Sequence, residues 1–189
     1  LAVLYEKTQQ NRKAERMYRT YASRLEDPLD AARVMAGFFE RTEQRSRIDE
    51  LIGELMQTVD DKVEVYRFYG AFLELHSPGQ AEQAYRQAIQ ADEQDPRGYW
   101  ALANFYAEQQ QWNKAVEQAR KCVELKSDSA RYRKGLNGFL ISAGKDEEAA
   151  SRLERYLEEN PEDPEALLHK GVLALWQGDV EQARALLDK

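Results

Sequence analysis

A small buried-type residue recurs along this chain at a nearly constant interval. The interval is 34 residues, and it separates Ala81, Ala115, Ala149 and Ala183. Continued backward, the series reaches Ile48 after 33 residues and Ala14 after a further 34. A fixed period of this length indicates a repeat architecture, in which one structural unit is copied along the chain and each copy packs on its neighbours.

The copy at residues 96–129 shows what the unit is. Apolar residues at helical spacing occupy its first half, at Tyr99, Leu102, Ala103 and Tyr106, and its second half, at Ala115, Val116, Ala119 and Cys122. Each half therefore predicts a helix with one apolar stripe. The two helices can bury their stripes against each other, but they leave a second apolar surface that only a neighbouring copy covers.

Helix start and stop signals agree with this period. Asp-Pro pairs at 27–28, 95–96 and 163–164 each place a capping carboxylate before a proline at the first helical position. Gly144 and Gly178 supply the left-handed conformation that ends a first helix. We expect twelve helices, two in each of six copies, with the second helix running over 11–25.

The order of large, small and aromatic positions in each copy resembles the tetratricopeptide repeat, and the likeness spans the whole chain. The resemblance implies an all-α fold, a right-handed α-solenoid or superhelix of antiparallel helix-turn-helix hairpins. We expect a single superhelical domain over 1–189, with repeats at approximately 1–26, 27–61, 62–95, 96–129, 130–163 and 164–189. The first and last repeats are incomplete, so we expect a segment of a longer protein.

Composition limits the functional classes. The net charge is −7 and the pI is about 5.1, which argues against a nucleic-acid surface, since phosphate binding requires clustered Lys and Arg. No stretch has the length and apolar character of a membrane span, and the opening residues lack a secretory leader, so we expect a soluble segment of either the cytoplasm or the periplasm. The only cysteine, Cys122, lies on an apolar stripe and is expected to be packed.

The sequence offers no catalytic or cofactor motif. His76 lies beside a turn and His169 stands alone on a helix, without a second His or Cys at metal-ligand spacing. Neither a phosphate-binding glycine loop nor a nucleophile elbow is present. We therefore predict a protein that is not an enzyme and has no metal or cofactor, in which both histidines are solvated or packed.

The family resemblance places function on the concave face formed by the first helices, which in such proteins binds an extended peptide or a helix. Tyr66 and Trp100 occupy equivalent positions in successive repeats, so we expect them to lie side by side within a basic cluster. The candidate groove residues are Tyr66, Arg67, Arg97, Trp100, Asn104, Arg131 and Lys134. Aromatic walls with positive charge favour an acidic or carboxylate-ended partner segment. The alternative is that Trp100 packs between helices and that the charges are only solvated.

One subset of these residues has a closer family parallel. Asn104, Arg131 and Lys134 are similar to the side chains with which some tetratricopeptide repeat proteins hold a C-terminal carboxylate. The chain departs from that pattern at Gly135 and Gly138, where further clamp side chains would be expected.

Three functional hypotheses follow. The first is a non-catalytic scaffold that binds a peptide or helix of a partner protein in the groove. The second is a self-association or assembly module, since both ends carry apolar stripes, at Leu1, Tyr5, Ala183 and Leu187, that are expected to be uncovered. The third is a recruiting arm of a larger enzyme whose catalytic part lies outside this segment.

Overall fold

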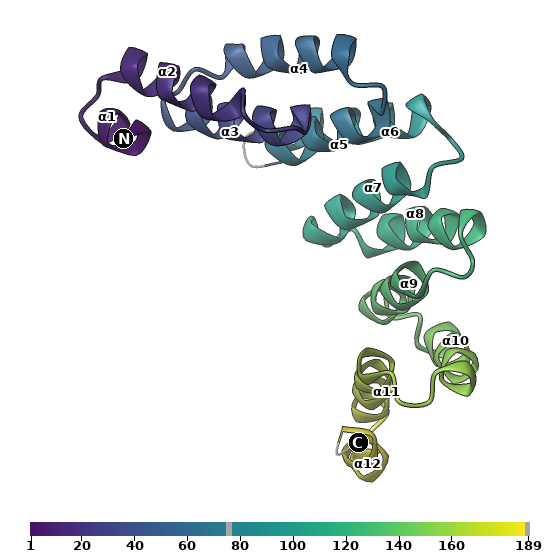
Figure 1. Cartoon of the computed structure of the whole chain (residues 1–189). Helices are drawn as coiled ribbons and strands as arrows, with labels where there is room; N and C mark the ends of the chain where they lie inside the picture. Colours follow the sequence, from purple (N-terminus) through teal and green to yellow (C-terminus); the bar gives the residue numbers. More distant parts are fainter. Residues whose placement is uncertain (75–76, 188–189) are drawn as a thin grey trace. The chain divides into compact units, whose positions relative to one another are not determined.

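The computed structural model describes residues 1–74 and 77–187, with side chains up to residue 186, and all regular structure in these residues is helical (Figure 1). Twelve helices follow one another in the described part of the chain, as the period predicts. They are α1 (Ala2–Lys7), α2 (Asn11–Ala22), α3 (Pro28–Arg41), α4 (Ser46–Thr58), α5 (Lys62–Leu73), α6 (Pro78–Ala91), α7 (Pro96–Glu108), α8 (Trp112–Leu125), α9 (Ala130–Ser142), α10 (Asp146–Glu159), α11 (Pro164–Trp176) and α12 (Val180–Leu187). None of the described helices is long and apolar enough to cross a membrane.

The six positions that set the period lie in the core. Ala14, Ile48, Ala81, Ala115 and Ala149 are each 0% exposed, and Ala183 is 1% exposed. The prediction that these residues face the packing surface is therefore confirmed. The expectation that Ala183 belongs to an uncovered terminal stripe is wrong, because α12 packs on α11. At the other end Leu1 is 73% exposed and Tyr5 is partly buried, whereas the side chain of Leu187 is outside the described residues.

The chain divides into two compact units, here called unit 1 (Leu1–Ala84) and unit 2 (Tyr85–Lys189), and the boundary falls inside α6. Each unit is a solenoid of antiparallel helix pairs with its own apolar core. The prediction of one continuous superhelical domain stays a prediction.

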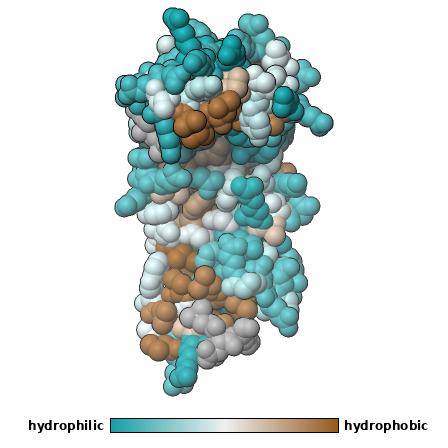
Figure 2. Space-filling model, turned by 60° about the vertical axis from the view of Figure 1, so that its left-hand side comes forward, coloured by the Kyte–Doolittle hydropathy of each residue, from teal (hydrophilic) through white to brown (hydrophobic). Residues whose placement is uncertain are grey.

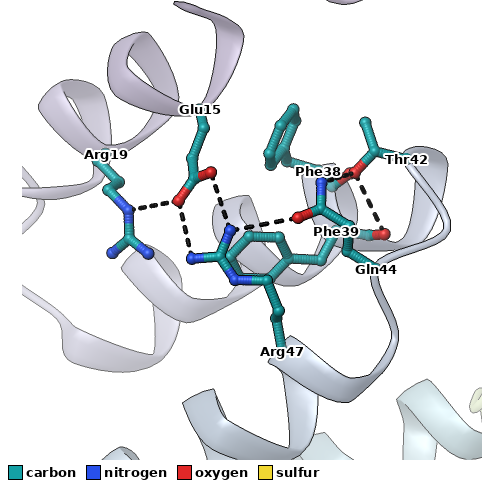
Figure 3. A network of polar contacts seen from close by, with 7 residues as sticks. All are labelled: Glu15, Arg19, Phe38, Phe39, Thr42, Gln44 and Arg47. Atoms are coloured by element: carbon teal, nitrogen blue, oxygen red, sulfur yellow. Dashed lines mark hydrogen bonds and ion pairs between the residues drawn. The ribbon is translucent and has the colours of Figure 1, made fainter. Parts of the chain in front are cut away.

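In unit 1, a polar network links consecutive hairpins beside the core (Figure 3). The guanidinium of Arg47 on α4 donates two hydrogen bonds to the carboxylate of Glu15 on α2, at 2.8 and 2.9 Å. It also lies 4.4 Å from the centre of the buried Phe39 ring on α3. Arg19 donates to the same carboxylate at 2.9 Å. A bidentate pair stacked on an aromatic ring fixes α2, α3 and α4 to one another in a defined register.

Helix ends follow the expected chemistry. Asp27, Asp95 and Asp163 each accept a hydrogen bond from a backbone N–H in the first turn of the helix that follows, at 2.8, 2.8 and 3.0 Å. Residues with positive φ close the hairpin turns at equivalent positions, which are Gln9 (56°), Glu43 (59°), Gln110 (56°), Gly144 (68°) and Gly178 (84°). One backbone shape therefore joins the helices of five hairpins, although only two of them place a glycine there.

The second helix is shorter than its apolar pattern predicts. It ends at Ala22 rather than at residue 25. The backbone N–H groups of Arg24 and Leu25 bond to the carbonyls three residues before them, both at 3.0 Å. This tighter winding turns the chain toward Asp27, which begins the next helix.

Candidate functional site

A hollow of about 500 Å³ opens on the side of unit 2 formed by α7, α9 and α11. Aromatic, apolar and small residues supply most of its lining. The lining residues are Trp100, Asn104, Trp112, Gly135, Gly138, Phe139, Ile141, Ser142, Glu165, His169, Val172 and Trp176. All three tryptophans of the chain are in this set.

At the inner wall of the hollow, the Trp100 indole packs directly against Gly135 of α9. Trp100 is 8% exposed, and its ring centre lies 5.2 Å from that of Tyr132 and 5.7 Å from that of Phe139, both on α9. A Cβ atom on Gly135 would lie 2.0 Å from Cη2 of the Trp100 indole. Only glycine therefore lets the indole lie against the backbone of α9. Trp100 on α7 therefore packs against α9, the first helix of the next repeat, as in the alternative interpretation of the sequence.

A second glycine on α9, Gly138, lies beside a histidine. The Cε1 and Nε2 atoms of His169 would each be 3.5 Å from a Cβ on Gly138, which is an ordinary contact distance. Burial lowers the pKa of His169, so the imidazole is neutral at pH 7. Its Nδ1 is buried and accepts or donates no hydrogen bond within the described part of the chain. His169 is thus packed, as expected, but it also lines the hollow.

Helix α11 and the start of α12 expose several large apolar side chains, one of which, Trp176, lines the hollow. Trp176 on α11 is 60% exposed, and Leu168 and Leu175 on the same helix are 49% and 45% exposed. Val180 at the start of α12 is 63% exposed. Figure 2 shows apolar side chains gathered at the lower end of the molecule, at the height where Figure 1 places α11 and α12. Exposed apolar side chains that gather in this way often mark an interaction surface.

Most of the basic groups predicted for the groove are already paired within the chain. Arg97 forms an ion pair with Asp95 at 2.6 Å. Lys134 contacts Glu165 at 2.7 Å and Asp163 at 3.3 Å, and the hydrogen bond to Glu165 raises the pKa of its ammonium group. These contacts satisfy Arg97 and Lys134 and reduce the positive potential at the site.

Arg131 is the predicted basic residue whose side chain contacts Trp100. It is exposed, and its guanidinium lies 5.6 Å from the centre of the Trp100 ring, in cation–π contact. Asn104 lines the hollow, and its side-chain amide donates to the Trp100 carbonyl one turn earlier at 2.9 Å. Trp100, Asn104 and Arg131, three of the predicted groove residues, therefore lie together.

The two remaining predicted residues lie on α5 in unit 1. Tyr66 is partly buried there, and Arg67 forms an ion pair with Glu64 one turn away. That Tyr66 and Trp100 share one groove stays a prediction.

Sequence reasoning missed the residues that close the hollow, namely Trp112, Phe139, His169 and Trp176. Of these four, only His169 faces a glycine of α9, and no sequence signal points to the other three. Gly135 and Gly138 were interpreted as missing clamp side chains, whereas in the structure Gly135 makes space for the Trp100 indole and Gly138 lies beside His169.

The other chemically active side chains are structural. Cys122 is fully buried, burial raises the pKa of its thiol to about 12, and its Sγ lies 3.4 Å from the Pro96 carbonyl oxygen. The prediction for His76 falls outside the described residues. Among the residues that are described, no group of His, Cys, Asp and Glu is arranged to hold a metal ion.

Two protein-family models match the sequence. One, for YpiA-like C-terminal tetratricopeptide repeats, matches residues 96–163, and one for the tetratricopeptide repeat matches residues 140–189. None of the curated proteins matches significantly.

Solved structures match over most of the chain. PilW, a widely conserved type IV pilus biogenesis factor, has a TM-score of 0.63 at 20% identity, and the match covers 98% of this chain and 87% of PilW. YrrB, a tetratricopeptide repeat protein with an unusual peptide-binding site, has a TM-score of 0.61 at 18% identity, covering 84% of this chain and 82% of YrrB. MamA has a TM-score of 0.63 at 14% identity, and the match covers 82% of this chain and 91% of MamA. At these low identities, the structural matches show the fold alone.

Proposed function

Since the chain is a tetratricopeptide repeat protein, we propose that it is a protein–protein interaction scaffold whose hollow on α7, α9 and α11 binds an apolar segment of a partner protein. Proteins of this family are generally non-catalytic. The observation that carries the proposal is the hollow itself, with three tryptophans, one phenylalanine and one neutral histidine around about 500 Å³. That volume is within the range of ligand sites, roughly 300–1,000 Å³.

The polar groups at the hollow are few, which is typical of a site that orients an apolar ligand. His169 and the partly exposed Asn104 are among the polar residues of the lining, and Nδ1 of His169 has no hydrogen-bond partner among the described residues. A partner segment with one or two large apolar side chains fills the lining, while its backbone or a polar side chain reaches these groups.

The charge preference of the proposed partner rests on Arg131. Because Arg97 and Lys134 are held by carboxylates of this chain, Arg131 is the basic group best placed to meet a carboxylate of the partner. We therefore propose an apolar segment with an acidic residue or a terminal carboxylate next to its anchoring side chain. YrrB, which has this fold and a peptide-binding site, supports a peptide as the class of ligand.

The test begins with selection of peptides from a displayed library, followed by calorimetric titration of the enriched sequences. We expect enrichment of apolar anchors beside an acidic residue. Trp176→Ala removes a rim side chain that is 60% exposed, so it should weaken binding at least about tenfold, the loss typical of an interface hot spot, with unchanged melting. The matched control is Tyr21→Ala, an aromatic that is 56% exposed in unit 1 and outside the hollow.

Two further variants separate the apolar and charged parts of the site. Gly138→Leu fills the hollow next to His169 and should abolish binding. Arg131→Glu should weaken acidic peptides and spare neutral ones. The proposal fails if selected peptides bind all three variants as tightly as they bind the wild type. Trp100→Ala is unsuitable for this purpose, because truncating a buried tryptophan costs about 3–5 kcal/mol of stability.

A second candidate function is self-association through α1. Leu1, Val3 and Leu4 are 73%, 55% and 58% exposed on one short helix, and such a surface is stabilised when another copy covers it. Sedimentation at increasing protein concentration tests this. A dimer that Leu4→Glu disrupts supports the proposal, whereas a monomer at every concentration rejects it.

A further inference from the structure

A second cleft lies in unit 2 between α8, α9 and α10, and it shares no lining residue with the hollow. Its volume is about 330 Å³. The lining residues are Val123, Ser127, Arg133, Asn137, Arg152, Arg155, Tyr156 and Glu159. Three of these eight side chains are arginines, in a protein whose net charge is −7.

The most buried arginine of the cleft, Arg152, has other arginines as neighbours. Burial lowers the pKa of Arg152, and the positive charges of Arg120, Arg133 and Arg155 lower it further, whereas Glu148 raises it. Glu148 is bonded to Arg120 at 2.6 Å. The second carboxylate, Glu159, is bonded to Arg133 at 2.7 Å. The cleft lining itself therefore holds three guanidinium groups and one carboxylate, an excess of two positive charges.

Two polar atoms in the cleft are buried without a hydrogen-bond partner among the described residues. They are Nε of Arg152 and Oδ1 of Asn137, and Asn137 as a whole is 1% exposed. Buried polar atoms of folded proteins are paired in most cases, because an unpaired one costs free energy. Both residues line the cleft.

The remaining polar groups of the cleft define what that ligand is. The Tyr156 hydroxyl already donates to Asp163 at 3.2 Å. Guanidinium groups are planar forks that bind phosphate oxygens in pairs. The Asn137 amide presents a donor to an oxyanion after a half-turn about its Cβ–Cγ bond, because its O and NH2 ends have nearly the same shape.

We propose that this cleft binds a dianionic phosphate group, held by Arg152 and Arg155 and contacted by Asn137. The two negative charges of the ligand match the excess of two positive charges, and the volume suits a small phosphate or phosphate ester. The phosphate comes either from solution or from a phosphorylated side chain of a partner protein, and both sources present the same oxygens.

The experiment is calorimetric titration of the protein in chloride buffer with inorganic phosphate and, separately, with a short peptide that contains phosphoserine. Binding in the submillimolar range by either probe supports the site. Tighter binding of the peptide identifies a phosphorylated partner as the source, and equal or tighter binding of inorganic phosphate identifies the free anion. The unphosphorylated peptide should not bind.

Arg152→Met is the diagnostic variant, because it keeps the apolar stem and removes the charge. It should weaken phosphate binding at least about tenfold, the loss expected for one charge-assisted hydrogen bond. It should also raise the melting temperature in phosphate-free buffer, since it removes a desolvated and repelled charge, and phosphate should no longer raise it further.

Two other variants keep the test decisive. Arg155→Met changes an exposed side chain of the same cleft and should also weaken binding. Arg24→Met makes the same change in net charge on an exposed residue of unit 1 and should leave binding unchanged. The proposal is overturned if neither probe binds the wild type, or if Arg24→Met weakens binding as much as Arg152→Met does.

Discussion

Replacing Gly135 with alanine gives the sharpest test of how unit 2 is packed. The added Cβ would lie 2.0 Å from Cη2 and 3.0 Å from Cζ2 and Cζ3 of Trp100. Those atoms belong to a rigid ring that is 8% exposed and in contact with Tyr132 and Phe139, so the ring cannot turn aside without disturbing α9. Overpacking of this kind costs about 1–3 kcal/mol.

The substitution also has a favourable effect, because alanine is a better helix former than glycine by about 1 kcal/mol. In the wild-type background we expect a net loss of up to about 2 kcal/mol, the overpacking cost less the helix gain. Trp100→Leu removes the benzo part of the indole, including all three contacted atoms. In that background the clash is gone, and Gly135→Ala should become stabilising by about 0.5–1 kcal/mol.

The assay is urea unfolding of the four proteins of this double-mutant cycle, followed by far-UV circular dichroism. Gly138→Ala on the same helix is the matched control. Its Cβ would be 3.5 Å from His169, so it should stabilise both backgrounds by the helix gain alone. If the effect of Gly135→Ala is the same with and without the indole, the glycine does not act as a seat for Trp100 and the account of the hollow is refuted.

Other regions give further predictions. Gln110→Gly should stabilise by about 0.5–1 kcal/mol in urea unfolding, because a non-glycine residue at φ 56° carries a strain of roughly 1–2 kcal/mol that exceeds the entropy cost of glycine. Glu15→Gln should destabilise by about 1–2 kcal/mol at pH 7, since it breaks the bidentate pair with Arg47. The hydrogen bond from Arg47 lowers the pKa of Glu15, so this stabilisation is present above about pH 4.3, the ordinary glutamate value, and disappears as the pH falls through the lower folded pKa. Acid titration of the unfolding midpoints should show the wild type converging on Glu15→Gln, and a constant difference would contradict the pairing. Cys122 should react with a thiol reagent only at the rate of unfolding, because its pKa is about 12 and it is fully buried, and a burst of labelling in the native protein would contradict that.

The fold was readable because period and chemistry agree at each copy. The residues at 14, 48, 81, 115, 149 and 183 are buried because a small or compact side chain at that point lets the second helix approach the first, and this requirement recurs with each hairpin. The Asp-Pro starts were equally legible, since capping depends on three or four neighbouring residues. The left-handed position at Gln110 was not legible, because the hairpin geometry imposes it on a residue that does not favour it.

The site was readable only in part, since it depends on pairs of residues far apart in the sequence. Helical spacing placed Trp100 and Asn104 on the correct helix, but the depth of Trp100 is set by Gly135, which is 35 positions away. Charge was misleading for a similar reason. Lys134 carries the positive charge expected of a ligand-binding residue, but it forms an ion pair with Glu165 from the next hairpin. The burial of Trp100 and the pairing of Lys134 both depend on contacts between neighbouring repeats, which residue spacing within one repeat does not reveal.

That every tryptophan of the chain lines a single hollow has an optical consequence. Indole emission from this protein originates from one face of unit 2, and unit 1, which has no tryptophan, is dark at the wavelengths that excite indole alone. A ligand that binds in the hollow displaces water from the exposed Trp176 and shifts the emission of this tryptophan to shorter wavelength, so binding can be followed without an added label. The protein therefore carries a built-in reporter for its own ligand.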